Sequence, residues 1–262
     1  MTGMPAPRER IVAALRGAAK QGQPALVAFL TAGFPDREGF RATVAAVAGE
    51  ADVIEIGVPF TDPMADGVTI QRASEQALRN GVTLPWILAE LAGMAPLSTP
   101  VLLMSYLNPL LSYGLARLAS DAAASGVCGF IVPDLPFDES EEFRALLAPR
   151  GLALVQMVTP VSSSERIAKL AGASQGFVYA VTMTGTTGKS IAAPEDIAEY
   201  LQRVRAAATV PVCAGFGIRS REQVDGLRGL VDGVIVGSAL VEVLERGESP
   251  GAWLAALRPP RR

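Results

Sequence analysis

The stretch "VIEIGVPFTDPMADG", residues 53–67, carries the pattern on which our fold prediction rests. It begins with a short apolar run that contains one carboxylate, Glu55, and continues into a segment rich in proline and glycine. The sequence "TIQRASEQAL" follows and has the composition of a helix. A short strand, a long loop and a helix in this order predict one βα unit.

The same alternation recurs along the whole chain. Short apolar, β-branched runs are separated by amphipathic stretches, and near-continuous apolarity is typical of parallel strands that are covered on both faces. The predicted strands are Ala25–Thr31, Val53–Ile56, Pro100–Ser105, Gly129–Val132, Leu152–Val158, Gly176–Thr182, Pro211–Gly215 and Asp232–Gly237. These eight units predict an α/β fold of the (β/α)₈ TIM-barrel type, with a doubly wound sheet as the alternative.

An additional helix is expected before the first strand. In "RERIVAALRGAAK", Ile11, Ala14 and Leu15 recur at helical spacing and would form its apolar stripe. No linker or low-complexity tract interrupts the chain, so we expect one domain over residues 1–262.

Composition limits the partners and the location. The 262 residues carry a net charge of -3, which gives no electrostatic reason to expect a nucleic acid partner. The first residues lack the apolar run of a signal peptide. Residues 91–116 contain no charge, but three prolines interrupt them, so we interpret them as helix end, strand and helix start rather than a membrane span. We expect a soluble, cytoplasmic protein.

Several reactive residues are scarce. The chain has no histidine, which excludes a Ser-His-Asp triad and every His-ligated zinc site. None of the three lysines, Lys20, Lys169 and Lys189, lies where a protected Schiff-base lysine is expected. Cys128 and Cys213 lack metal-ligand spacing and are expected to be reduced core thiols. We therefore predict no metal and no cofactor, and chemistry carried by carboxylates, hydroxyls and backbone dipoles.

Two carboxylates are candidates for that chemistry. Strand alternation places Val53 and Glu55 on one face, and burial inside a barrel would raise the pKa of Glu55 towards neutrality. The alternative is a structural glutamate paired with an arginine. Asp66 ends the following loop, where it could equally cap a helix or form an Asx turn. Asp62, before a proline, could likewise be a turn residue.

Glycine-rich segments follow the last three predicted strands. They are "TGTTG" at residues 184–188, "GFG" at residues 215–217 and "GSAL" at residues 237–240. Barrels often bind phosphate with the loops after their last strands and a helix N-terminus, where glycines let backbone N–H groups approach the anion. Alternatively, the glycines mark the ends of helices and strands.

The sequence resembles the tryptophan synthase alpha subunit family. The most specific run is "IEIGVPFTDPMADGVTIQRA", supported in family order by "AFLTAGFPD", "MSYLNPLLSYG", "VPDLP", "FVYAVTMTGTTG", "AGFGI" and "VGSALVE". The resemblance implies retro-aldol cleavage of indole-3-glycerol phosphate to indole and glyceraldehyde 3-phosphate. The indole ring can accept the electrons once its C3 is protonated, which fits the scarcity of lysine.

The resemblance also implies roles for individual residues. Glu55 matches the catalytic glutamate that protonates C3 and takes the hydroxyl proton, and Asp66 matches the aspartate that accepts the indole N–H. The other matched positions are Tyr106, Tyr179 and Phe216 for the substrate, Gly188, Gly217, Gly237 and Ser238 for phosphate, Thr187 for the lid, and Asp62 and Pro59 for the partner-facing loop. The lid departs from the family at Met183 and Thr186, where arginine and valine are common.

The resemblance implies a protein partner as well. The leading hypothesis is an alpha subunit in an αββα complex that passes indole to a beta subunit. The alternatives are a free-standing indole-releasing lyase, a non-catalytic regulator of the beta subunit, or another phosphate-binding barrel such as an isomerase. The intact pair of Glu55 and Asp66 argues against a non-catalytic role.

Overall fold

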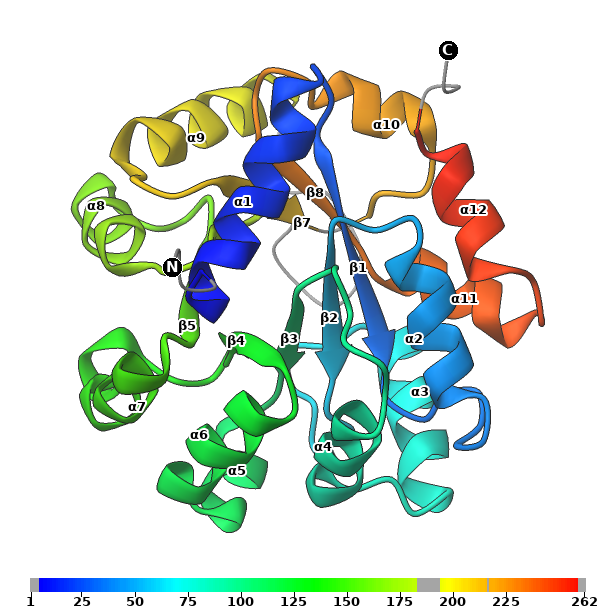
Figure 1. The fold of residues 1–262 in the computed structure, drawn as a ribbon. Helices are drawn as coiled ribbons and strands as arrows, with labels where there is room; N and C mark the ends of the chain where they lie inside the picture. The colour runs from blue at the N-terminus through cyan, green and yellow to red at the C-terminus, as the bar shows by residue number, and fades with distance from the viewer. Residues whose placement is uncertain (1–4, 183–193, 216, 259–262) are drawn as a thin grey trace.

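Eight parallel strands form a closed barrel in which each strand pairs with its neighbour in sequence and β8 pairs with β1 (Figure 1). The computed structural model describes residues 5–182, 194–215 and 217–258. The strands are β1 (Ala25–Thr31), β2 (Val53–Gly57), β3 (Val101–Met104), β4 (Val127–Ile131), β5 (Ala153–Val158), β6 (Val178–Val181), β7 (Val212–Gly215) and β8 (Gly233–Val236). The predicted TIM barrel is confirmed, and the doubly wound alternative is wrong.

Helices surround this barrel. They are α1 (Pro7–Lys20), α2 (Phe40–Ala48), α3 (Val68–Arg79), α4 (Leu84–Ala92), α5 (Leu107–Tyr113), α6 (Leu115–Ala124), α7 (Glu141–Leu147), α8 (Ser164–Ala173), α9 (Pro194–Ala207), α10 (Arg221–Gly226), α11 (Ser238–Glu245) and α12 (Pro250–Ala256), with 3₁₀ turns η1 (Phe137–Glu139) and η2 (Ala148–Arg150). Within the described ranges, none is both long and apolar enough to cross a membrane.

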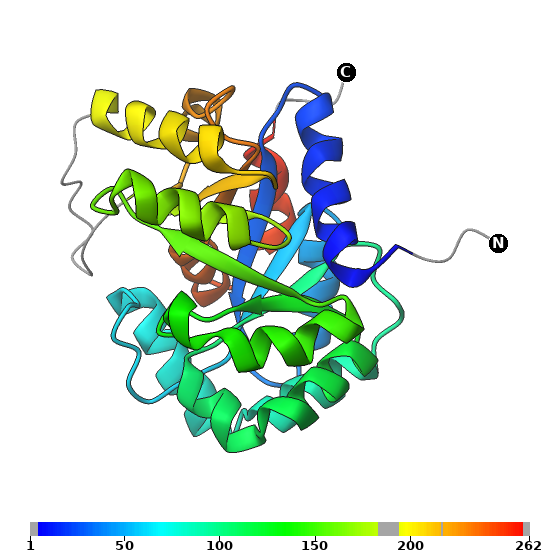
Figure 2. The ribbon, with the colours of Figure 1, turned by 90° about the vertical axis from the view of Figure 1, so that its left-hand side faces the viewer.

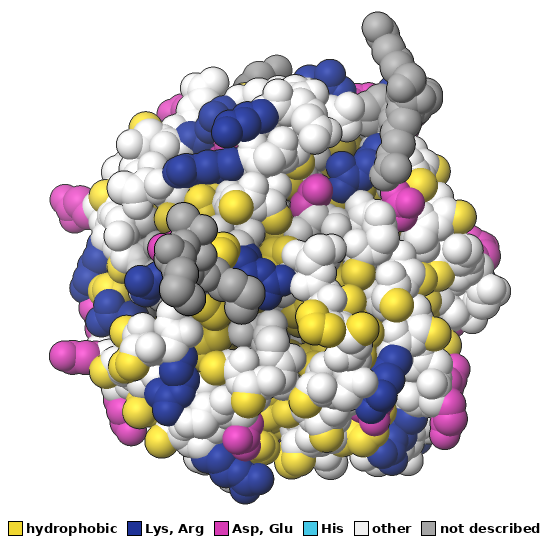
Figure 3. All heavy atoms as spheres, in the orientation of Figure 1, with side chains coloured by type: hydrophobic (Ala, Val, Ile, Leu, Met, Phe, Trp, Pro, Cys, Tyr) yellow, Lys and Arg dark blue, Asp and Glu magenta, His cyan; other side chains and the backbone are white. Residues whose placement is uncertain are grey.

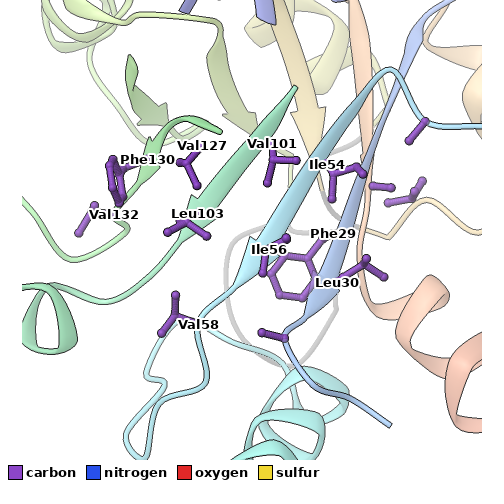
Figure 4. Packing of buried hydrophobic residues seen from close by; sticks show 14 of the residues in the cluster. Phe29, Leu30, Ile54, Ile56, Val58, Val101, Leu103, Val127, Phe130 and Val132 are labelled. Atoms are coloured by element: carbon purple, nitrogen blue, oxygen red, sulfur yellow. The ribbon is translucent and has the colours of Figure 1, made fainter. Parts of the chain in front are cut away.

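Side-chain alternation along the strands separates two apolar layers. Ile54 and Ile56 of β2 and Leu103 of β3 belong to the layer between the barrel and its helices (Figure 4). Val53 and Leu102, one position away on the same strands, belong to the interior of the barrel. The strands are therefore apolar on both faces, as their sequences indicate.

The N-terminal helix α1 closes the amino end of the barrel. Its Ile11 and Leu15 are fully buried, and Ile11 lies against Gly176, just before β6. Leu15 lies against Gly233, the first residue of β8. Arg10 donates from its guanidinium to the carbonyl of Leu97 at 2.8 Å, which ties the helix to the segment before β3. Figure 2 shows α1 along one side of the molecule. The expected extra helix is confirmed.

The fourth strand differs from its prediction. It was expected at Gly129–Val132, but it runs from Val127 to Ile131. Gly129 is an interior residue of this strand, and a Cβ there would lie 2.5 Å from the carbonyl oxygen of Ala153 on β5. Glycine here allows two strands to approach closely, whereas the sequence alone suggested a strand start.

Two smaller expectations concern thiols and surface charge. Cys128 and Cys213 are both free and buried, as predicted. On the face drawn in Figure 3, basic and acidic side chains are interspersed. That mixture agrees with the absence of a charge-based reason to expect nucleic acid binding.

Candidate active site

Glu55 is an ionisable residue whose side chain is fully buried. It is the third residue of β2, its Cα pairs with those of Phe29 and Leu102, and its exposed fraction is 0%. Across the described ranges, neither carboxyl oxygen has a hydrogen-bond partner, so the alternative of a glutamate paired with arginine is wrong. Burial raises the pKa of Glu55 from 4.5 to about 8, and the group therefore carries a proton at neutral pH.

Asp66 is the second acid, and it lies in the loop after β2. Burial raises the pKa of Asp66 from 3.8 to about 6, while a hydrogen bond from Tyr106 acts in the opposite direction. The carboxyl does not cap α3, because the N-cap residue is Gly67 and no side chain caps that helix end. Asp66 is thus mostly ionised at neutral pH, unlike Glu55.

Tyr106 fixes the position of this loop. Its side chain is 5% exposed, and its hydroxyl accepts the backbone N–H of Ala65 at 2.9 Å while also bonding the carboxyl of Asp66. The ring stacks on Phe60, with centroids 5.3 Å apart and planes at 30°. Tyr106 directly follows Ser105 at the end of β3, so one side chain ties the acidic loop to the barrel.

Tyr179 on β6 brings the two acids into one site. It is 5% exposed, and burial is the largest cause of its raised hydroxyl pKa. The carboxylates of Glu55 and Asp66 lie close enough to raise that pKa further. Its ring occupies the space beside Gly215, where an added Cβ would lie 2.6 Å from the tyrosine hydroxyl oxygen. The first glycine of "GFG" is therefore required by the packing of Tyr179.

Three of the predicted phosphate-binding residues, Gly217, Gly237 and Ser238, follow neighbouring strands. Gly217 follows β7 with a φ of 79°, a conformation that favours glycine. Gly237 is the N-cap of α11, and Ser238 is the first residue of that helix. Since β7 pairs with β8, these two loops emerge side by side at the carboxyl end of the barrel. Three further predicted residues, Thr187, Gly188 and Phe216, lie outside the described residues.

The predicted partner loop divides into a buried and an exposed part. Pro59 is buried within this chain, where it shapes the loop. Asp62 is exposed, and Met64 is 77% exposed, which is unusual for a large apolar side chain. Val68, at the start of α3, is 70% exposed. The exposed apolar side chains are features of a surface that a partner could cover.

Two residues at the end of β1 were not identified from the sequence. Phe29 lies against Gly57, because a Cβ added there would be 2.5 Å from its ring. Thr31 is 2% exposed, and its hydroxyl has no hydrogen-bond partner in the described part of the chain. Both follow Ala25 and Val27 at alternate positions of β1, and this alternation was the available signal.

Comparison with known proteins agrees with this arrangement. Residues 15–256 match the family model described as "Tryptophan synthase alpha chain". The chain is 45% identical over 249 residues to the tryptophan synthase alpha chain of Nitratidesulfovibrio vulgaris, covering 94% of this chain and 97% of that protein. It is 43% identical over 242 residues to the alpha chain of Geobacter sulfurreducens, covering 89% and 92%.

Solved structures show the same fold at similar coverage. A tryptophan synthase structure from Mycobacterium tuberculosis superposes with a TM-score of 0.86 at 37% identity, covering 96% of this chain and 99% of that chain. The tryptophan synthase subunit alpha of Legionella pneumophila superposes with a TM-score of 0.83 at 32% identity, with 95% of each chain covered. Matches of this length and identity establish the relationship, and the chain belongs to the tryptophan synthase alpha chain family.

Proposed function

We propose that Glu55 and Asp66 perform the lyase reaction of this family, the cleavage of indole-3-glycerol phosphate to indole and glyceraldehyde 3-phosphate. The observation that carries the proposal is the difference between two carboxyls at one site: the pKa of buried Glu55 is about 8 and that of Asp66 is about 6. Carboxyls whose environments separate their pKa values in this way can serve as acid and base at the same pH.

The proposed reaction conserves protons within the site. Protonated Glu55 gives its proton to C3 of the indole ring, and ionised Asp66 accepts the ring N–H as positive charge develops. The bond from C3 to the side-chain carbon then breaks, its electrons return to the ring, and the hydroxyl becomes the aldehyde carbonyl. The hydroxyl proton passes to the carboxylate of Glu55, which restores the starting state. The ring accepts the electrons, so the proposal requires neither a metal nor a Schiff base.

The phosphate end of the substrate is assigned to the loops after β7 and β8. Gly217 leaves room for an anion to approach the backbone, and the first N–H groups of α11 have no partner within the helix. Ser238 adds a hydroxyl donor at the same helix end. Gly188, Thr187 and Phe216 are assigned to phosphate, lid and substrate, respectively, on the resemblance alone.

The pH dependence is the first test of this assignment. Activity needs Glu55 protonated and Asp66 ionised. A plot of kcat/KM against pH should therefore be bell-shaped, rising with a pKa of about 6 and falling with a pKa of about 8. The measurement is indole release from indole-3-glycerol phosphate at subsaturating substrate across that range. A profile that still rises above pH 9 would show that the acid is not Glu55.

Tyr106→Phe tests the hydrogen bond to Asp66. The variant keeps the ring on Phe60 but removes the hydroxyl that lowers the pKa of Asp66, so that pKa should rise above about 6. The acidic limb of kcat/KM should move to higher pH, with activity at pH 6 reduced several-fold. Tyr113→Phe is the matched control, because it removes a tyrosine–aspartate hydrogen bond, to Asp121, on the surface. An unmoved acidic limb in the Tyr106 variant would contradict the assignment.

A beta subunit is the proposed partner. The related Mycobacterium tuberculosis structures are described as tryptophan synthase, and this chain exposes Asp62, Met64 and Val68 beside the catalytic loop. We place them at the interface of an αββα complex in which indole passes to the beta subunit. The biosynthetic role supports a cytoplasmic location, and closure of the barrel from β1 to β8 supports one domain.

The decisive experiment measures indole release with and without a beta subunit. A higher lyase rate and co-elution of the two chains are expected. If indole is released but neither effect occurs, the free-standing lyase replaces the complex. If indole-3-glycerol phosphate is not cleaved under either condition while the chain still binds the beta subunit, the regulatory alternative replaces the lyase.

A further inference from the structure

An ion pair joins the two elements that we assign to phosphate. Arg219 lies in the segment after β7. Its two terminal guanidinium nitrogens each donate a hydrogen bond to a different carboxylate oxygen of Glu242 on α11, at 2.7 and 2.9 Å. Arg219 lies two residues after Gly217, and Glu242 lies about one helical turn after Ser238. The fork-to-fork geometry fixes both distance and orientation between the loop and the helix.

The same carboxylate reaches a third element. The hydroxyl of Thr69 lies 3.4 Å from the Oε1 atom of Glu242, close to the limit for a hydrogen bond. Thr69 is in the first turn of α3, the helix that begins two residues after Asp66, and Figure 1 shows α3 beside α11. One glutamate on the helix after β8 therefore contacts both the loop after β7 and the helix after the acidic loop.

Other contacts hold Arg219 in this position. Its backbone N–H donates to the side-chain oxygen of Gln223 at 2.6 Å, and Ser220 caps α10 directly after it. The Arg219 hydrogen bonds lower the pKa of Glu242, so the carboxylate stays ionised at neutral pH. The Glu242 side chain is 26% exposed and that of Arg219 is 54% exposed, so solvent partly screens the pair and its effect should be modest.

We propose that Arg219 and Glu242 are positioning residues that hold the loop after β7 against α11, so that Gly217 and the N-terminus of α11 face the same phosphate group. The inference rests on the phosphate assignment made under the proposed function. Both side chains act through the backbone segments they join. Their loss should therefore weaken binding of the phosphate group and leave the proton transfers at Glu55 unchanged.

Binding of glycerol 3-phosphate, measured by calorimetry, is the direct test. Arg219→Met and Glu242→Gln should each raise its Kd about fivefold, the size expected from losing one bidentate pair of this exposure. The double variant should lose no more than the larger single effect, because both changes break the same contact. Arg219→Lys keeps the charge without the fork and should fall between wild type and Arg219→Met.

A second ion pair in the same region supplies the matched control. Arg72 of α3 and Glu245 of α11 form an ion pair at 2.6 Å that does not involve the loop after β7. Arg72→Met and Glu245→Gln should leave the Kd for glycerol 3-phosphate within twofold of wild type. If the control and test variants lose the same affinity for glycerol 3-phosphate, the proposal is overturned. Any weakening of the contacts of α11 would then be enough to explain the loss.

Kinetics in the synthetic direction separates positioning from general damage. Condensation of indole with glyceraldehyde 3-phosphate should show a raised KM for the aldehyde in Arg219→Met. Condensation with unphosphorylated glyceraldehyde should keep the wild-type kcat/KM. If both aldehydes are affected equally, the pair does not act on phosphate. Thermal melting of each variant identifies any that fail to fold, and the milder Arg219→Lys then carries the test.

Failure of this inference can be told from failure of the phosphate assignment. Ser238→Asp places a negative charge at the N-terminus of α11 and should abolish glycerol 3-phosphate binding. Loss of binding in Ser238→Asp with unchanged binding in Arg219→Met would overturn the positioning pair alone. No binding by the wild type, or no effect of Ser238→Asp, would overturn the phosphate assignment and the inference with it.

Discussion

Glu55→Gln is expected to lower kcat for indole release by about 10⁴-fold while glycerol 3-phosphate still binds. Glutamine matches the size of the neutral glutamic acid, so the barrel interior should accept it. It can neither give a proton to C3 nor take one from the hydroxyl, and both transfers are assigned to this group. The measurement is steady-state indole release together with calorimetric phosphate binding.

The same variant should be more stable than wild type at neutral pH. The pKa of Glu55 is raised from 4.5 to about 8 on folding, so ionisation opposes the folded state. This penalty is absent below pH 4.5, grows as pH rises, and is complete above about pH 8; at pH 7 it is about 3 kcal/mol. Urea unfolding from pH 4 to 9 should show that Glu55→Gln gains stability over wild type as pH rises.

Glu75→Gln is the control for both effects of Glu55→Gln. Glu75 is on the exposed side of α3 and pairs with Arg79 one turn away. Its replacement should change neither kcat nor the pH dependence of unfolding. Near-wild-type indole release by Glu55→Gln would falsify the acid–base assignment, whatever its stability.

Asp66→Asn is expected to lower kcat by about 10²- to 10³-fold, with a smaller effect on KM. The carboxylate is assigned to the indole N–H as positive charge develops, so its negative charge matters most in the transition state. The amide oxygen of asparagine can accept the same hydrogen bond but carries no net charge. Single-turnover release of indole is the appropriate measurement because it isolates cleavage from product dissociation.

The control for Asp66→Asn comes from the same loop. Asp62→Asn makes the same chemical change at an exposed position, and the isolated chain should keep its activity. Because Gly67 follows, the Asp66 variant contains Asn–Gly, which is prone to deamidation back to a carboxylate. Mass spectrometry must therefore confirm the amide, and Asp66→Ala provides a second variant. Full activity in both variants would remove Asp66 from the mechanism.

Local sequence patterns predicted most of the barrel because each strand is apolar on both faces. Ala25–Thr31 was predicted with the bounds that the structure has, and β2 differs by one residue, Gly57. The alternation that placed Val53 and Glu55 on one face is confirmed, because Val53 belongs to the interior cluster of Tyr179 and Cys213, and the carboxyl of Glu55 lies near the same two side chains. A period of two residues is a local property, so it could be read without tertiary information.

Contacts between distant residues could not be predicted in this way. Residues 65 and 106 are far apart in sequence, and nothing near Tyr106 indicates that its hydroxyl accepts the N–H of Ala65. The pairing of Arg219 with Glu242 likewise depends on how two loops meet at adjacent strand ends. The resemblance to the family indicated the substrate and the candidate site residues. The structure showed which side chains and backbone groups those residues contact.

Closure of the amino end by α1 has a consequence for proton exchange with the solvent. Among the described residues, Ile11 and Leu15 fill the amino end of the barrel, so we expect water to reach Glu55 from the carboxyl end. A substrate bound there would separate the carboxyl from bulk water for the duration of a turnover. The proton that Glu55 receives from one hydroxyl would then serve the next substrate molecule, and kcat should not depend on buffer concentration.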